Sequence, residues 1–478
     1  MTSASAVAHA ELHFDSGAFF NQLAQRVACR TESQEPTSAP LLQAYLTDQM
    51  APALRALGFG VTLHDNPLAG APPLLTAERT EDPTLPTVLF YGHGDVVRGH
   101  AGQWADGRDP WTLTAVGPAD NPKIGERWYG RGSADNKAQH SINIAALAAV
   151  LSARGGRLGF NAKWLLEMGE ETGSPGLAAF CQQEQQRLAA DVLIASDGPR
   201  LRADRPTVFL GSRGVANFDL VLNARAGGHH SGNWGGLLRN PGTVLANAIA
   251  SLVDGRGVIR VEGLRPPPIP ASVRAALADI RVGGGPGDPA IDASWGEPGL
   301  SPPERVFGWN TLEVLAIGCG NPAQPVNAIP PSARATLQLR FVVGSQAGRI
   351  RELVLAHLAD NGFEGISCTE PVVMQATRLD PDNAWVRLAL QSLEHSTGIK
   401  PALLPNLGGS LPNDVFACIL GLPTVWLPHS YPACSQHAPD EHVLPALLRQ
   451  GLGMTAALLW RVGEEAASLP RRPVGCCA

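Results

Sequence analysis

TVLFYGHGDVV, residues 87–97, is the stretch that decides the fold class of this 478-residue chain. Its first five residues form a short apolar run of β-branched and aromatic side chains that ends at a glycine, which predicts a buried strand. Two similar runs, NAKWLLEM at 161–168 and DVLIA at 191–195, predict further strands, and helical spacing at 141–153 and 174–190 separates the three. Strands that alternate with helices indicate an α/β domain with a mostly parallel sheet flanked by helices.

The pattern changes near residue 211. Residues 214–223 alternate between apolar and polar side chains, as a half-exposed strand does. Further strands are predicted at 311–318, 334–343 and 368–373, and helices at 240–253 and 346–361. Residues 264–308 are rich in Pro and Gly and have weak periodicity, a pattern that predicts a long irregular segment at the surface. The α/β character resumes with a helix at 383–397 and a strand near 423–427. We therefore predict a catalytic domain over 1–210 and 376–478, interrupted by an α+β domain over 211–375.

Composition limits the class of protein. The formal net charge is −6 and 44% of residues are hydrophobic, so neither disorder nor a nucleic-acid partner is expected. The eight cysteines are scattered without C-x-x-C spacing, which favours reduced thiols in a cytoplasmic protein. We expect no signal peptide and no membrane span, because no basic stretch precedes an apolar one at the start and no run of 18 apolar residues occurs. The terminal RRPVGCCA does not fit a prenylation box, so Cys476 and Cys477 are expected to lie in a frayed tail.

Polar side chains recur directly after the predicted strands, where ligands gather in α/β sheets. In His93-Gly94-Asp95, extended backbone puts the outer two side chains on one side, so Asp95 can accept the outer N–H of the His93 imidazole and fix its tautomer. The other motifs are Asp135 in GRGSADNKAQ, Glu170-Glu171 in EMGEETGSPG, Asp197 in IASDGPR and His437 in SQHAPDEH.

Together these motifs offer two histidines and three carboxylates as metal ligands, with one spare carboxylate and one orienting aspartate. A mixed nitrogen and oxygen ligand set suits zinc and is compatible with manganese or cobalt. Two metals about 3.5–4 Å apart need a bridging carboxylate, and such a pair activates water and polarises a carbonyl. The ligand set is therefore compatible with a pair of metals that activates water.

The order H-x-D, G-x-x-D-N-K, G-E-E-x-G-S, S-D-G and a late histidine resembles the co-catalytic dizinc exopeptidase and deacylase family. That family includes carnosinase-type dipeptidases, carboxypeptidase G, succinyl-diaminopimelate desuccinylase and aminoacylases. The matching motifs run from His93 to His437 and cover most of the chain. The resemblance implies two Zn²⁺ per subunit, a ferredoxin-like α+β insert that serves as lid and dimerisation domain, and a homodimer.

The resemblance also assigns roles to the motif residues. Five are implied to be metal ligands: His93 and Asp197 on one metal, Glu171 and His437 on the other, and Asp135 bridging both, followed by a cis peptide bond to Asn136. Asp95 would orient the histidine beside it. Glu170 would be the general base that takes a proton from the attacking water and passes it to the leaving amine. Adjacent residues on extended backbone point apart, which would let one glutamate bind metal while its neighbour serves the water.

The inserted domain carries further motifs of this family. GGHHSGNWGG resembles its H-S-G-x-x-G-G loop, which assigns His230, rather than His229, to stabilising the oxyanion in the active site of a partner subunit. Asn327 and Arg340, 13 residues apart, resemble its substrate-binding pair, in which a guanidinium forks onto a substrate carboxylate. The stretch 408–410, with Gly409 and Ser410, resembles the glycine-rich loop that holds the carboxyl end of the substrate.

These features favour a metal-dependent hydrolase that cleaves an amide bond in a small carboxylate-bearing substrate. A dipeptidase or carboxypeptidase is preferred, because Asp197 stands where the deacylases more often carry glutamate. An N-acyl-amino-acid deacylase breaks the same type of bond and remains an alternative. A catalytically silent binding protein is a more distant one, since a silent relative usually loses a ligand or the base, and all are present. The expected partners are a peptide or N-acyl amino acid and a second copy of the chain, with no nucleic acid and no membrane.

Overall fold

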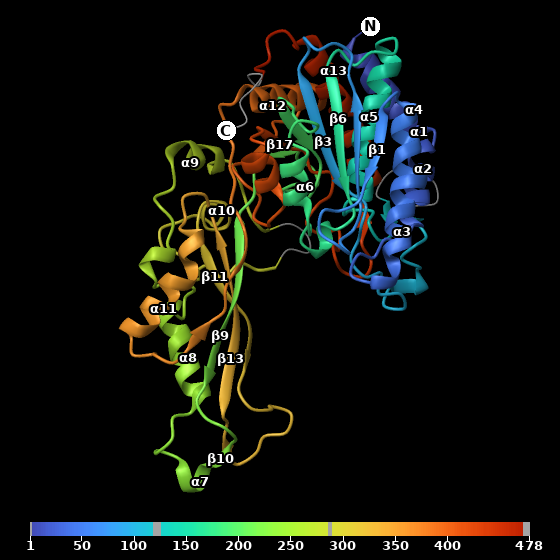
Figure 1. The fold of residues 1–478 in the computed structure, drawn as a ribbon. Coiled ribbons are helices and arrows are strands. Elements are labelled where there is room, and N and C mark those ends of the chain that lie inside the picture. Colours follow the sequence, from blue (N-terminus) through green and yellow to red (C-terminus); the bar gives the residue numbers. More distant parts are fainter. Residues whose placement is uncertain (1, 118–125, 285–288, 472–478) are drawn as a thin grey trace.

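The computed structural model describes residues 2–117, 126–284 and 289–471. Over these residues the fold is α/β, as predicted, with a large mixed sheet flanked by helices and a second sheet that extends away from it (Figure 1). The large sheet contains eight strands, in the spatial order β1 (Gly60–His64), β2 (Leu74–Arg79), β6 (Asn161–Glu167), β3 (Thr87–His93), β7 (Val192–Ala195), β17 (Thr424–Trp426), β8 (Thr207–Phe209) and β16 (Ala402–Leu404).

The three strands predicted around the first motif lie side by side in the middle of this sheet. β3 pairs in parallel with β6 on one side and with β7 on the other, and β17 runs parallel to β7. β2 pairs antiparallel with β6, and β1 completes that edge. Because β3, β6 and β7 run in the same direction, their carboxyl ends meet at one edge of the sheet, where ligand sites of α/β proteins form.

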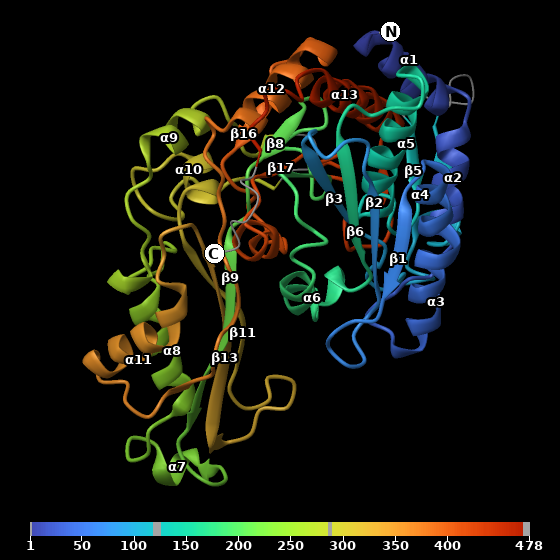
Figure 2. The same ribbon diagram turned by 45° about the horizontal axis from the view of Figure 1, so that its top comes forward.

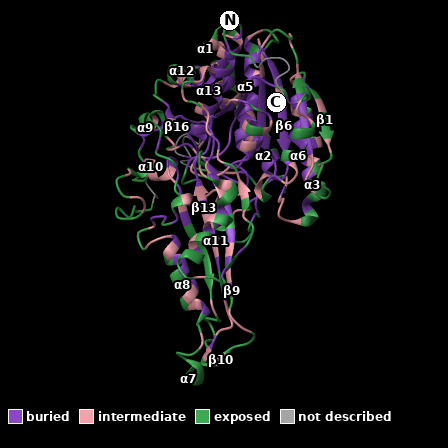
Figure 3. Ribbon diagram, turned by 60° about the vertical axis from the view of Figure 1, so that its left-hand side comes forward, coloured by how far each residue is buried: buried purple, intermediate pink, exposed green. Residues whose placement is uncertain are grey.

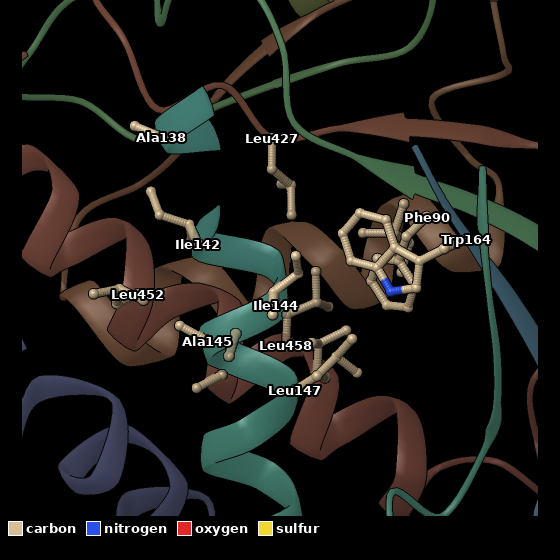
Figure 4. Close-up of a cluster of buried hydrophobic side chains, with 14 of the residues drawn as sticks. Phe90, Ala138, Ile142, Ile144, Ala145, Leu147, Trp164, Leu427, Leu452 and Leu458 are labelled. Atoms are coloured by element: carbon tan, nitrogen blue, oxygen red, sulfur yellow. The ribbon is translucent and has the colours of Figure 1, made fainter. Parts of the chain in front are cut away.

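The side chains of β3 alternate between two apolar clusters, which shows that both faces of the large sheet are buried. Val88 and Phe90 enter the first cluster, while Leu89 and Tyr91 enter the second. Phe90 stacks on Trp164 of β6 with the ring centroids 5.1 Å apart. Figure 4 shows this pair beside apolar side chains of two helices. Full burial of each aromatic side chain contributes about 1.5–3 kcal/mol to stability.

Helices from both ends of the chain cover the first cluster (Figure 2): α1 (Ser3–Asp15), α2 (Ala18–Val27), α5 (Lys137–Ala153), α12 (Ala384–Thr397) and α13 (Pro445–Glu464). α5 begins four residues before the predicted helix at 141–153, so Asp135 lies directly before its first turn. Among the described residues, no helix has both the length and the apolar character needed to cross a membrane.

Shorter elements surround the sheet. β18 pairs with β5, and β5 pairs with β4, in a small antiparallel sheet. The bounds of the short elements are η1 (Pro36–Ser38), α3 (Ala39–Ala44), η2 (Tyr45–Met50), α4 (Ala51–Ala56), η3 (Ala105–Gly107), β4 (Thr114–Val116), β5 (Arg127–Tyr129), η4 (Glu170–Thr172), α6 (Leu177–Gln183), η7 (Val415–Ile419) and β18 (His442–Val443). The helix predicted at 174–190 is therefore shorter than expected.

A second sheet is built from residues of the predicted insert. Its strands are β9 (Gly214–Asn223), β11 (Thr311–Gly318), β13 (Ser332–Phe341), β14 (Ser367–Cys368) and β15 (Val372–Met374), and all pairings are antiparallel. β9 and β11 have the predicted bounds, whereas the single strand predicted at 368–373 is two short strands. α8 (Pro241–Leu252), α11 (Ile350–Asp360) and η6 (Ala347–Arg349) pack against this sheet around a third apolar cluster.

The far end of the second sheet is exposed, in contrast to the large sheet (Figure 3). This end carries β10 (His229–His230), α7 (Ser231–Trp234) and β12 (Ala328–Ile329), and β10 pairs with β12. Figure 1 places β10 and α7 at the opposite end of the molecule from the helices that cover the large sheet.

Most described residues of 264–308 lie at the surface, as predicted, but the stretch contains more regular structure than expected and is anchored by a few buried side chains. This region contains α9 (Ala271–Leu277) and α10 (Pro302–Phe307), preceded by η5 (Glu262–Leu264). Val273, Leu277 and Phe307 are buried in the second apolar cluster together with Leu89 of β3. The stretch therefore covers one face of the large sheet. Cys476 and Cys477 lie outside the described residues.

Candidate metal centre

The five predicted metal ligands come together at the carboxyl edge of the large sheet. Four of them come from strand ends, a helix start or a short turn: His93 ends β3, Asp135 precedes α5, Glu171 lies in η4 after β6, and Asp197 follows β7. The fifth, His437, lies in the loop before β18. They form two groups that share Asp135, and within each group one ligand atom per residue lies within 4.8 Å of the others.

The first group is His93, Asp135 and Asp197, all buried. His93 Nε2 lies 3.0 Å from Oδ1 of Asp135 and 3.6 Å from Oδ2 of Asp197. One imidazole nitrogen and two carboxylate oxygens therefore point at a common position. Such a set of nitrogen and oxygen donors suits a divalent transition metal.

The second group is Asp135, Glu171 and His437. His437 Nε2 lies 3.0 Å from Oδ2 of Asp135 and 3.1 Å from Oε2 of Glu171. The side chain of His437 is 52% exposed, whereas that of Glu171 is 3% exposed. The two oxygens of Asp135 thus face different groups, which is the arrangement a bridging carboxylate needs.

Asp95 contacts both His93 and the glutamate pair. Its Oδ1 lies 3.3 Å from Nδ1 of His93, and its backbone carbonyl oxygen lies 3.1 Å from the same nitrogen. Its carboxylate also accepts the backbone N–H groups of Glu170 and Glu171, at 3.2 and 3.1 Å. The prediction that this pair lies on extended backbone is wrong, because residues 170–172 form the 3₁₀ turn η4. Successive residues of such a turn are rotated by about 120°, which is consistent with Glu171 joining a ligand group that Glu170 does not join.

The electrostatics of the cluster favour a cation. Burial raises the pKa of Glu171 to about 7 and the pKa of Asp197 to about 6, and the charge of Asp135 adds to both shifts. Burial and the neighbouring carboxylates also hold the pKa of Glu170 well above its ordinary value. Hydrogen bonds to Asp135 and Glu171 raise the pKa of His437 to about 11. The carboxylates therefore need positive charge nearby to be ionised together.

Two buried oxygens of the cluster accept no hydrogen bond, namely Oε1 of Glu171 and Oδ2 of Asp197. A buried acceptor without a donor costs about 1–3 kcal/mol, so such atoms require an explanation. Coordination of a cation satisfies both oxygens, and the donor types match those of zinc. The residues present therefore fit a divalent metal at each group.

The peptide bond between Asp135 and Asn136 is cis, as predicted. The Asn136 side chain donates to the carbonyl of Ser196 and lies 3.0 Å from Nδ1 of His140. His140 in turn contacts the hydroxyl of Tyr45 through Nε2. These contacts hold the residue after Asp135 between α5 and the end of β7.

The predicted substrate residues Arg340 and Ser410 lie together. Arg340 Nη1 donates to Oγ of Ser410 at 2.8 Å, and Gly409 is the residue beside it in the same loop. No described carboxylate forms an ion pair with Arg340. A second cation, Arg213, was missed by the sequence reasoning: its Nε donates to the carbonyl of Gly408, and its carbonyl accepts the Ser410 hydroxyl. Two guanidinium groups, those of Arg213 and Arg340, therefore lie at this loop.

His230 and Asn327 are not brought to the metal cluster within one chain. Both are exposed at the far end of the second sheet, where the carbonyl of Asn327 accepts the N–H of Ser231. Asn327 precedes β12, whereas Arg340 lies near the end of β13, so the predicted pair is also apart. A single chain thus brings the metal ligands together and leaves His230 and Asn327 elsewhere.

Two more polar residues near the cluster were missed. The side chain of Gln436 donates to Oδ2 of Asp135. Glu441 is buried and accepts the backbone N–H of Asp135. Both flank His437 within SQHAPDEH, and proximity to a ligand is the only signal the sequence offers for them.

The chain is similar to known proteins over most of its length. Residues 89–461 match the model of peptidase family M20/M25/M40. The chain is 34% identical over 269 residues to the β-Ala-His dipeptidase of Mus musculus, covering 53% of this chain and 51% of that protein. It is 26% identical over 375 residues to a cysteinylglycine-S-conjugate dipeptidase of Corynebacterium striatum, covering 76% and 77%.

Among solved structures, human carnosine dipeptidase 1 superposes with a TM-score of 0.75 at 24% identity, covering 97% of this chain and 99% of that one. At this identity the likeness establishes the fold. In sequence, the chain matches about half the length of the β-Ala-His dipeptidases.

Proposed function

This chain belongs to peptidase family M20/M25/M40, and from that premise we propose that it is a dizinc dipeptidase or carboxypeptidase. The reaction is hydrolysis of an amide bond in a small substrate with a free carboxylate. The observation that carries the proposal is the pair of ligand groups that share Asp135, with Glu170 beside them but in neither group. The names of the two dipeptidase relatives support the choice of dipeptides.

In this proposal His93 and Asp197 would hold one zinc ion, Glu171 and His437 would hold the other, and Asp135 would be shared by both. Mn²⁺ or Co²⁺ can replace zinc, because the ligand set contains no thiolate. When bound, such a metal pair acts as a Lewis acid on the substrate carbonyl and lowers the pKa of water. Asp95 keeps the imidazole of His93 oriented through Nδ1.

Glu170 is the general base. It takes a proton from the attacking water and later delivers it to the leaving amine. Burial raises the pKa of its carboxyl group well above the ordinary value, which favours holding a proton. The backbone hydrogen bond from Glu170 to Asp95 fixes the position of this residue relative to His93.

Arg340, Gly409 and Ser410 bind the substrate carboxylate. A guanidinium gives two parallel charge-assisted hydrogen bonds to a carboxylate, and the Ser410 hydroxyl lies 2.8 Å from Arg340 Nη1. The absence of an ion pair to Arg340 within the described residues leaves this cation for a ligand.

The second sheet belongs to a lid and dimerisation domain over 211–375, inserted into a catalytic domain of 1–210 and 376–478. β11 is its edge strand, and Val314, Leu315 and Ile317 on this strand are exposed. An exposed apolar edge strand pairs readily with another chain, and a second copy is the proposed occupant. In such a homodimer His230 and Asn327 serve the active site of the other subunit.

We place the enzyme in the cytoplasm. The six cysteines of the described residues are all free, as expected for a protein of a reducing compartment.

A substrate panel tests the function. Purified enzyme is loaded with Zn²⁺ and assayed with dipeptides and with N-acyl amino acids by release of amine. Dipeptides should be hydrolysed, the activity should be lost on chelation, and Zn²⁺, Mn²⁺ or Co²⁺ should restore it. Hydrolysis of N-acyl amino acids without dipeptides would make the protein a deacylase. Tight metal binding without turnover of either class would make it a silent binding protein.

A further inference from the structure

Glu441 is a buried carboxylate, with 1% of its side chain exposed, that gathers hydrogen bonds from one loop. Its Oε1 accepts the backbone N–H groups of Ala134 and Asp135, at 2.8 and 3.1 Å. Its Oε2 accepts the N–H of Gly132 at 3.0 Å and Nη1 of Arg131 at 2.8 Å. All four donors lie in the loop that ends with the bridging carboxylate.

The backbone of Glu441 adds a fifth contact, because its carbonyl accepts the N–H of Gly130 at 3.0 Å. Glu441 itself follows His437 by four residues and precedes β18 directly. It therefore ties the Asp135 loop to the His437 loop. These loops come from opposite parts of the sequence, and each supplies ligands to the metal cluster.

We propose that Glu441 is a positioning residue of the metal centre, which fixes the main chain of Asp135 relative to His437. The inference rests on the proposed metal site. A ligand residue whose backbone is already held in place loses less conformational freedom when the metal binds. The hydrogen bonds that hold it therefore determine the affinity for the metal as well as the stability of the protein. Arg131 neutralises the buried charge of Glu441 and is itself held over the ring of Trp104.

The chain offers a matched control in Glu81. Its side chain is 6% exposed, and it accepts the backbone N–H groups of Leu158 and Gly159 together with an N–H of Arg79. The chemistry is the same as at Glu441. Glu81, however, lies beside the amino end of β6, at the opposite edge of the large sheet from the metal ligands.

The experiment compares Glu441→Gln, Glu441→Asp and Glu81→Gln. A glutamine amide cannot accept hydrogen bonds through its NH₂, so each Gln variant loses the contacts of one oxygen. Thermal unfolding of the metal-free proteins should show a lower Tm for both Gln variants. Zinc affinity is measured without substrate by competition with a chromophoric chelator. Glu441→Gln should bind zinc about 10–100-fold more weakly than wild type, whereas Glu81→Gln should retain its affinity.

Glu441→Asp keeps the charge but shortens the side chain, so we expect an intermediate loss of zinc affinity. This variant replaces Glu441→Gln in the test if the latter does not fold. The visible spectrum of the Co²⁺ form should change in the Glu441 variants alone. Zinc affinity within about twofold of wild type in a folded Glu441 variant would overturn the inference. In that case wild type still binds two metals and the proposed function stands; wild type that binds no divalent metal would instead overturn the metal centre itself.

Discussion

Replacing Glu170 with glutamine should abolish most of the catalytic rate and leave the metal centre intact. Glu170 belongs to neither ligand group, and its contact with Asp95 uses its backbone N–H, which the substitution keeps. The change therefore removes only the ability to accept and return a proton. General acid–base catalysis contributes about 10²–10⁴-fold, so kcat should fall by that factor. This loss corresponds to about 3–5 kcal/mol in the activation barrier.

The assay is steady-state hydrolysis of the best dipeptide, with metal content determined on the same samples. KM and bound metal should match wild type, because no group in contact with metal or with the substrate carboxylate is changed. Glu170→Ala should lose as much activity. If kcat of Glu170→Gln stays within about threefold of wild type at full metal loading, Glu170 is not the base.

Three further outcomes are expected. Burial raises the pKa of Glu167 to about 7 from an ordinary 4.5, so this carboxyl contributes stability below pH 4.5 that is lost as the pH rises through 7. The side-chain oxygen of Glu167→Gln can still accept the hydroxyl hydrogens of Tyr91 and Ser174. In thermal unfolding scans, the free energy of unfolding of this variant minus that of wild type should therefore increase by up to about 3 kcal/mol between pH 4.5 and pH 8. A difference that does not change with pH would contradict this. Arg340→Met should raise KM about 10–150-fold for a dipeptide but little for the dipeptide amide, because a charge-assisted hydrogen bond to the substrate carboxylate contributes about 1.5–3 kcal/mol. Arg334→Met, on the same strand, is the control. Equal effects of Arg340→Met on both substrates would exclude binding of the substrate carboxylate by Arg340. If His230 acts across a dimer, mixing inactive His230→Ala and Glu170→Gln subunits should restore activity, whereas an active monomer in sedimentation would refute the dimer.

The sequence alone predicts the structure where the local pattern of apolar and polar side chains matches the environment of those side chains in the folded protein. β9 alternates because one face of the second sheet is buried, and its bounds match the prediction at both ends. The ends of β3 and β7 carry His93 and, two residues beyond the strand, Asp197, so parallel pairing alone brings these residues to one edge. The ligand cluster could therefore be predicted from strand direction and motif order.

Other features depend on contacts that local pattern does not encode. In α9, Val273 and Leu277 are four residues apart, as on a helix face, but prolines and glycines around them obscure the pattern, and burial depends on docking to the large sheet. The 3₁₀ turn of Glu170 and Glu171 is fixed by Asp95, which is remote in sequence. The role of Glu441 likewise depends on a loop that precedes it by some 300 residues.

The order of strands in the large sheet has a consequence for biosynthesis. β17 inserts between β7 and β8, although the whole second sheet is made between β8 and β17 along the chain. The second sheet is a continuous segment and can fold while the ribosome is still at work, but the large sheet has to wait for residues near the end of the chain. Until β17 arrives, the apolar edge of β7 is an unpaired strand edge, which is prone to aggregation. Slow translation anywhere between β8 and β17, or termination before β17, should therefore lower the yield of soluble protein by prolonging the exposure of this edge.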